Sequence, residues 1–75
     1  MMELVMMMKI SYKPLWKLLI DRDLKKKDLC RLAQIAPASV TKMGRSGHVS
    51  TETLCKICDA LHVSIDQILE ITIED

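Results

Sequence analysis

The chain has 75 residues, 49% of them apolar and 28% charged, and a net charge of +1. This length can enclose one small hydrophobic core, which excludes a multidomain protein. With one Trp, one Tyr, no Phe, two glycines and two prolines, the composition favours an aliphatic, mostly helical core over a many-turned β-sandwich or a disordered tail.

The N-terminal stretch MMELVMMM is apolar, but it has no basic leading region and no small-residue cleavage site, and Lys9 interrupts the apolar run early. We therefore expect no targeting segment. No apolar run approaches the roughly 20 residues that a membrane span needs. The sequence predicts a soluble, cytoplasmic protein with no membrane contact.

Residues 1–11 are predicted to form an arm or a strand, and residues 70–75 a second strand or a tail. The C-terminal EITI alternates polar and β-branched residues, which is typical of a strand, and a lone strand is unstable without a partner. The N-terminal LVMMMKI is the available partner, so we predict antiparallel pairing of the two ends, within one chain or across a dimer. The alternative is a frayed N-terminus. Met6, Met7 and Met8 are the predicted partner-facing residues, because methionine-rich surfaces adapt readily.

The segment PLWKLLID predicts a first helix that begins at Pro14, where the missing N–H costs nothing. Leu15, Leu18 and Leu19 stand at i, i+3 and i+4, which is the spacing of a helix stripe. Ser11 lies just ahead and is a candidate cap.

The segment KKDLCRLAQ predicts a second helix, because Leu29, Leu32 and Ala33 repeat this spacing. Asp28 falls in its first turn, where a negative charge complements the helix dipole. Cys30 is a further small apolar residue near the stripe.

A proline then breaks the most regular part of the chain. Pro37 disfavours helical geometry at Ala36, so the chain must turn there, and a third helix over residues 37–43 begins with proline at its first position. The two helices would turn apolar residues inward: Leu29, Leu32, Ile35, Val40 and Met43.

The segment GRSGH holds both glycines and predicts the loop that ends the third helix. Ser50 is the expected cap of a fourth helix, whose inward face would be Leu54, Ile57, Cys58 and Leu61. Ser64 and Gln67 match a capping box that opens a fifth, short helix with the apolar residues Ile65, Ile68 and Leu69.

Charge is distributed unevenly along the chain. Residues 25–48 carry six basic residues against one acid, a net charge of +5, whereas residues 49–75 carry one basic residue against six acids, a net charge of −5. The cationic block coincides with the proline-broken pair of helices, which indicates a polyanionic partner for one face of the protein. The alternative interpretation is an ordinary solvated surface.

Two short helices joined by a tight turn, with small residues at their crossing, predict a helix-turn-helix. The segments KKDLCRLAQIAPASVTKM and VSTETLCKICDALHVSIDQIL resemble the phage-repressor/Cro class of bacterial and phage regulators, also called the xenobiotic-response-element-like family. The resemblance covers residues 12–69. It implies a five-helix, all-α domain, to which the paired terminal strands would be added.

The resemblance also implies which residues bind DNA. The third helix would lie in the major groove with Pro37, Ala38, Thr41 and Lys42 outward and Ser39 near the DNA backbone. Of these, Lys42 can donate to guanine or to a phosphate, and Thr41 can donate to a base or meet a thymine methyl. The remaining contacts would go to phosphates, from the start of the second helix and from the following loop: Lys25, Lys26, Arg45, Ser46, the backbone of Gly47, and His48.

The sequence departs from the family pattern at two positions. Gln34 stands where a glycine usually ends the second helix in a left-handed conformation, which predicts a strained or differently closed turn. Ala36 stands where a serine or threonine often caps the recognition helix, and the missing cap is worth about 1 kcal/mol.

Cys55 and Cys58 form a CxxC pair, for which three readings stay open. Zinc would need four ligands, and the other candidates are Cys30, His48 and His62, without the usual spacing. Redox sensing would need accessible thiols of low pKa. The third reading is that Cys58 and Cys30 are small core residues.

The sequence therefore predicts a transcriptional regulator, with repression as the expected effect, that binds a double-stranded DNA operator as a homodimer. The alternative is a protein-interaction module, or an antitoxin-like protein that binds a protein partner and keeps the fold. We expect no enzyme activity and no cofactor or metal, because the sequence shows neither a cluster of nucleophile and base nor a phosphate-binding glycine loop.

Overall fold

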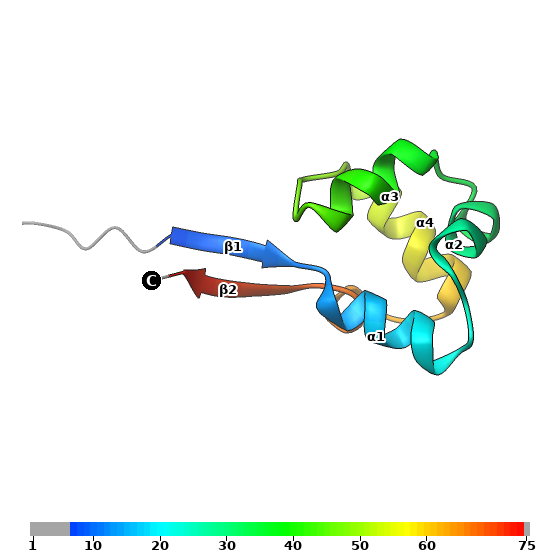
Figure 1. The fold of residues 1–75 in the computed structure, drawn as a ribbon, viewed down its shortest axis with the longest axis horizontal. Helices are drawn as coiled ribbons and strands as arrows, with labels where there is room; N and C mark the ends of the chain where they lie inside the picture. Colours follow the sequence, from blue (N-terminus) through cyan, green and yellow to red (C-terminus); the bar gives the residue numbers. More distant parts are fainter. Residues whose placement is uncertain (1–6, 75) are drawn as a thin grey trace, which may run out of the picture.

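The computed structural model describes residues 7–74, which form four α-helices, one 3₁₀ turn and a two-stranded sheet. The elements follow the chain in the order β1 (Met7–Ser11), α1 (Lys13–Asp21), α2 (Lys26–Ala33), α3 (Pro37–Gly44), α4 (Thr51–Leu61), η1 (Ile65–Gln67) and β2 (Glu70–Glu74). The helices form one body, and the two strands extend from it as a ribbon (Figure 1). The mostly helical fold with paired terminal strands is confirmed.

The helix ends follow the local chemistry that the sequence indicates. Pro14 lies in the first turn of α1, which begins one residue earlier than predicted, at Lys13. Tyr12, and not Ser11, is the N-cap residue; the Ser11 hydroxyl accepts the Lys13 N–H at 3.3 Å from one position before it. Ser50 caps α4, because its hydroxyl accepts the Thr53 N–H at 3.2 Å. Each bond satisfies a backbone donor that a helix N-terminus leaves without a partner.

The predicted fifth helix is a single 3₁₀ turn of three residues, Ile65–Gln67. The Gln67 side chain accepts the Ser64 N–H at 3.0 Å, as a capping box requires. Ile68 is fully buried while Ile65 is 49% exposed, so only one apolar face holds this segment to the body. The short turn carries the chain directly from α4 into β2.

The core is aliphatic apart from Tyr12 and lies between the helices. Its buried residues are Tyr12, Leu15, Leu19, Leu29, Ala33, Ile35, Val40, Met43, Leu54, Ile57, Leu61 and Ile68. The prediction that Leu32 faces inward is wrong, because its side chain is 52% exposed. Leu29 and Ala33 already fill the stripe of α2 that faces α4, and Leu32 lies off that stripe. No helix among residues 7–74 is long and apolar enough to cross a membrane.

The ends of the chain pair as predicted, and they do so within one chain. β1 and β2 are antiparallel, with Met7 opposite Glu74, Lys9 opposite Thr72 and Ile10 opposite Ile71. The body anchors the ribbon at its base, where Ile10 packs against the core. Of the three methionines predicted to face a partner, Met6 lies outside the described residues, as do the side chains of Met7 and Met8.

Candidate nucleic-acid interface

α2 and α3 form the two arms of a helix-turn-helix. The turn between them opens at Gln34, which adopts the left-handed conformation with φ 56° and ψ 49°. The Ile35 N–H donates to the Cys30 carbonyl at 3.1 Å, and the Ile35 side chain is buried. The turn therefore has the geometry that a glycine usually provides, formed here by a glutamine. Ala36 precedes α3 in an extended conformation and provides no side-chain cap.

α3 has a buried side and an exposed side. Val40 and Met43 are buried, 4% and 1% exposed, and hold the helix to the body. The predicted outward residues are on the opposite side. Pro37, Ala38, Thr41 and Lys42 are exposed, and Ser39 is half-buried. α3 thus presents a solvent-facing row with two hydrogen-bonding side chains, Thr41 and Lys42.

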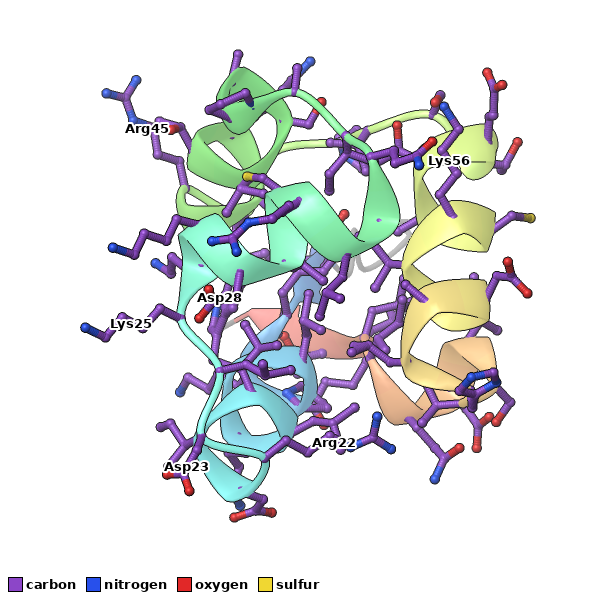
Figure 2. The ribbon with its side chains drawn as sticks, turned by 90° about the vertical axis from the view of Figure 1, so that its right-hand side faces the viewer. Arg22, Asp23, Lys25, Asp28, Arg45 and Lys56 are labelled. Atoms are coloured by element: carbon purple, nitrogen blue, oxygen red, sulfur yellow. The ribbon has the colours of Figure 1, made fainter. Side chains whose placement is uncertain are left out.

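Three exposed lysines mark the start of α2, namely Lys25, Lys26 and Lys27. The Lys26 ammonium lies 4.6 Å from the centroid of the Trp16 ring, a cation–π contact that holds this side chain against α1. Trp16 is partly buried against the core. The cation–π contact places the Lys26 side chain next to α3, 3.7 Å from where a Cβ at Gly44 would lie, whereas Lys25 projects into solvent (Figure 2).

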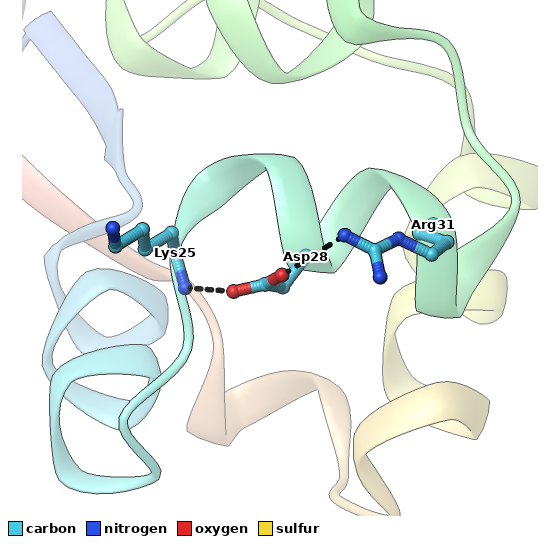
Figure 3. A network of polar contacts seen from close by, with 3 residues as sticks. All are labelled: Lys25, Asp28 and Arg31. Carbon is cyan, nitrogen blue, oxygen red and sulfur yellow. Dashed lines mark hydrogen bonds and ion pairs between the residues drawn. The ribbon is translucent and has the colours of Figure 1, made fainter.

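Asp28 closes the N-terminus of α2 (Figure 3). Its carboxylate accepts the Lys25 N–H at 2.8 Å through Oδ2 and pairs with the Arg31 guanidinium at 3.2 Å through Oδ1. The acid caps the helix from its third residue and complements the helix dipole, as the sequence predicts. Arg31 offsets its charge, so the segment remains cationic.

The loop after α3 is folded back on that helix. The Gly47 N–H donates to the Lys42 carbonyl at 2.8 Å, and the buried Tyr12 hydroxyl donates to the Gly47 carbonyl at 3.3 Å. Burial raises the pKa of Tyr12, so its hydroxyl stays protonated and able to donate to a higher pH than an exposed tyrosine would. Ser46 is half-buried with φ 60°, while Arg45 and His48 are exposed.

A groove of about 450 Å³ runs between α2 and α3. Its lining is basic and apolar: Lys26, Lys27, Cys30, Pro37, Val40, Thr41, Gly44 and Arg45. Figure 2 shows Lys25 and Arg45 projecting from the same side of the body, while Lys56 lies on α4 at the other side. The groove brings Lys26, Pro37, Thr41 and Arg45 of the predicted site together, and Lys25 lies on the same side as Arg45. We use the name cationic face for these residues and Lys27 together with the other exposed or half-buried residues of the predicted site, which are Ala38, Ser39, Lys42, Ser46 and His48.

Two members of this arrangement are missing from the sequence-based site. Lys27 lines the groove beside Lys26, and the run of three lysines was the signal that could have included it. Tyr12 anchors the loop from a position 35 residues earlier. No local pattern shows such a long-range contact, because it depends on how α1 packs beneath the loop.

The surroundings of the three cysteines do not indicate a redox or a metal site. Cys58 is half-buried against the core, and its pKa is raised by burial, and further by the nearby Cys55 and Asp66. A raised pKa keeps the thiol protonated and unreactive at neutral pH, which argues against a redox sensor at this residue. Cys30 is also half-buried, and Cys55 is exposed. Within residues 7–74 no three His, Cys, Asp or Glu side chains are grouped as a metal site would need.

Comparison with known proteins agrees with this geometry. Residues 14–74 match the profile of the Cro/C1-type HTH DNA-binding domain. The crystal structure of the transcriptional regulator VanUg (Form II) is similar over 99% of this chain and 100% of that one, with a TM-score of 0.85 and 36% sequence identity. A search of curated proteins found no match.

The matched profile spans nearly the whole helical body and both arms of the helix-turn-helix, and the similarity to VanUg includes the ribbon. The chain belongs to the Cro/C1-type helix-turn-helix DNA-binding family.

Proposed function

We propose that this protein is a transcriptional repressor that binds a specific DNA operator through its cationic face, with α3 in the major groove. The observation that carries the proposal is the groove between α2 and α3, where the lysine-rich start of α2, outward residues of α3 and Arg45 after it meet. The similarity to a transcriptional regulator supports it. A protein whose ligand is chromosomal DNA would act in the cytoplasm of a bacterial cell.

The proposed roles follow from the chemistry of each side chain. Lys42 and Thr41 would read base edges, because an ammonium donates to guanine O6 or N7 and a threonine offers both a hydroxyl and a methyl. Pro37 and Ala38 would provide apolar contact, which suits a thymine methyl. The other members of the face would bind phosphates, whose contacts position a protein without reading sequence.

A single domain covers one half-site, so we propose that the protein binds as a homodimer on a two-fold symmetric operator. Two recognition helices would then enter successive major grooves about 34 Å apart.

The test is a fluorescence-polarisation titration against a randomised duplex pool at two salt concentrations, with sequencing of the retained DNA. We expect enrichment of a two-fold symmetric motif and a steep fall in affinity with salt, because lysine and arginine contacts release counterions. Lys42→Glu should abolish enrichment. Lys56→Glu is the matched control, since it makes the same charge reversal at an exposed lysine on the other side of the body. Equal loss in both variants would show that only net charge matters and would refute reading by α3.

A second candidate function is protein binding, either as an interaction module or in an antitoxin-like role combined with operator binding. The observation that favours it is an apolar surface at the α1–α2 end, where Ile20 is 72% and Leu32 is 52% exposed, with Leu24 lining the shallow pocket beside each. If folded wild-type protein retains no duplex at low salt, this candidate replaces the operator-binding function.

A further inference from the structure

The chain has one tyrosine, one tryptophan and no phenylalanine, and its two large aromatic rings pack together where β1 passes into α1. The ring centroids of Tyr12 and Trp16 are 6.5 Å apart, and the ring planes are tilted by 55°. Two aromatic rings attract each other at this separation. Tyr12 is buried, and Trp16 is half-buried against the core. We call these two residues the aromatic pair.

Each member of the aromatic pair holds a different part of the cationic face. The Tyr12 hydroxyl donates to the Gly47 carbonyl at 3.3 Å, in the loop that follows α3. The Trp16 ring has the Lys26 ammonium 4.6 Å from its centroid, at the start of α2. Two segments that are expected to bind phosphates, one before α3 in the chain and one after it, are therefore held by side chains that contact each other.

The loop after α3 needs such support because its backbone is strained. The Ser46 N–H donates to the Met43 carbonyl at 2.9 Å. The Gly47 N–H donates to the Lys42 carbonyl at 2.8 Å. These two bonds form a Schellman motif, which needs a left-handed residue at Ser46, and the φ of Ser46 is 60°. Glycine is usual at this position because a side chain there costs conformational energy. Such strain persists only where surrounding contacts oppose relaxation, and the Tyr12 hydroxyl provides one from outside the loop.

We propose that the aromatic pair is a positioning unit for DNA binding, in which Tyr12 holds the phosphate-binding loop and Trp16 holds Lys26. This inference rests on the proposed function of the cationic face, and it adds two residues that act through the groups they hold. A loop and a lysine that are already held in place lose less conformational freedom on binding, so the unit raises affinity. Phosphate contacts position a protein without reading sequence, so loss of the unit should weaken binding to all duplexes alike.

Tyr12→Phe is the sharpest test, because it removes the hydroxyl and keeps the ring. The first measurement is amide hydrogen exchange of the full chain by NMR, without DNA. The Ser46 and Gly47 amides should exchange at least several-fold faster in the variant. The Val63 amide, which closes the same kind of left-handed end on α4, is the matched control and should keep its rate. Unchanged exchange of the two loop amides would overturn the proposal.

The second measurement is the affinity of the folded protein for a short fluorescein-labelled duplex of random sequence at low salt. Tyr12→Phe should weaken binding about two- to tenfold, which is the net contribution of one hydrogen bond. In an Arg45→Ala background the same change should have less effect, because the loop then has one phosphate contact fewer to position. Trp16→Leu should weaken binding too, and less so in a Lys26→Met background. Additive effects in both pairs would refute action through the loop and the lysine.

Ser11→Ala is the matched control for affinity. It deletes a hydroxyl one residue before Tyr12, whose bond to the Lys13 N–H is also 3.3 Å long but stays within the junction of β1 and α1. Equal affinity of wild type and Tyr12→Phe, or an equal loss in Ser11→Ala, would overturn this inference and leave the proposed function intact. A wild type that binds no duplex would refute the proposed function, and faster loop exchange in Tyr12→Phe would then show a contact that serves stability alone.

Discussion

The two glycines should respond in opposite ways to alanine, although both lie near the end of α3. Gly47 approaches Lys42 so closely that an added Cβ would lie 2.6 Å from Lys42 Cγ and 3.0 Å from the Lys42 carbonyl oxygen. The first separation is shorter than real Cβ contacts allow, and the second involves backbone that cannot move freely. In contrast, a Cβ at Gly44 would meet only the Lys26 ammonium, at an ordinary 3.7 Å.

The expected cost of Gly47→Ala follows from these contacts. Overpacking typically costs about 1–3 kcal/mol, and opening the Gly47 N–H bond to Lys42 would cost about 1 kcal/mol. The alanine also restricts the unfolded chain, which returns roughly 0.4–1 kcal/mol. We expect a net loss of about 1–3.5 kcal/mol, and in a domain of this size each kcal/mol lowers Tm by roughly 4–8 °C. Gly44→Ala, at the end of a helix, should instead gain up to about 1 kcal/mol.

Urea and thermal unfolding followed by circular dichroism would measure both variants against wild type. Two-state fits with a common m-value would show that the native structure, and not the unfolded ensemble, carries the difference. If Gly47→Ala is as stable as wild type, or if Gly44→Ala is the more damaging change, then the close approach of the loop to α3 is wrong.

Three further predictions concern single side chains. Gln34→Gly should raise the free energy of unfolding by roughly 0.5 kcal/mol, because its left-handed backbone suits glycine; chemical denaturation would measure this, and a loss of stability would contradict the conformation of the turn. Arg22→Met should lower it by about 1 kcal/mol, since the guanidinium donates to the Leu61 carbonyl at 2.6 Å at the C-terminus of α4; an unchanged Tm would show that water replaces this cap. In native protein at neutral pH, a maleimide should modify Cys55 well before Cys58, whose pKa is raised by burial. The Cys58 thiol ionises at a lower pH in the unfolded chain than in the folded one, so stability should fall as pH rises above about 9. Cys58→Ala should reduce that fall. Equal labelling rates by mass spectrometry would contradict the burial of Cys58.

Local patterns were sufficient to predict most of the helices. Proline at the first turn of α1 and α3, the serine cap of α4 and the spacing of Leu29 and Ala33 each act over a few residues, and such short-range signals can be read directly from sequence. The prediction that failed, the burial of Leu32, depends on contacts between helices that are distant in the sequence. Leu32 fits the helical period as well as its neighbours do, but the position of α4 decides which side of α2 is buried.

At the cationic face, too, features set by nearby residues could be predicted from the sequence and long-range contacts could not. The charge block and the outward row of α3 could be predicted, because both follow from composition and helical spacing. The contact from Tyr12 to the loop, and the contact of Lys26 with Trp16, join segments that pack together only in the folded chain. Of the two outcomes expected at Gln34, a strained or a differently closed turn, the structure has the first: the backbone is left-handed with a glutamine in place of glycine.

The contact between Lys26 and Trp16 gives the protein a built-in optical reporter. Trp16 is the sole tryptophan of the chain, so all indole emission comes from a ring that has a lysine ammonium 4.6 Å from its centroid. A nearby cation shifts indole emission electrostatically, and a phosphate that draws Lys26 away would change that shift. Engagement of the α2 lysines by a nucleic acid could thus be followed without any label, and Lys26→Met would silence the signal while leaving the ring in place.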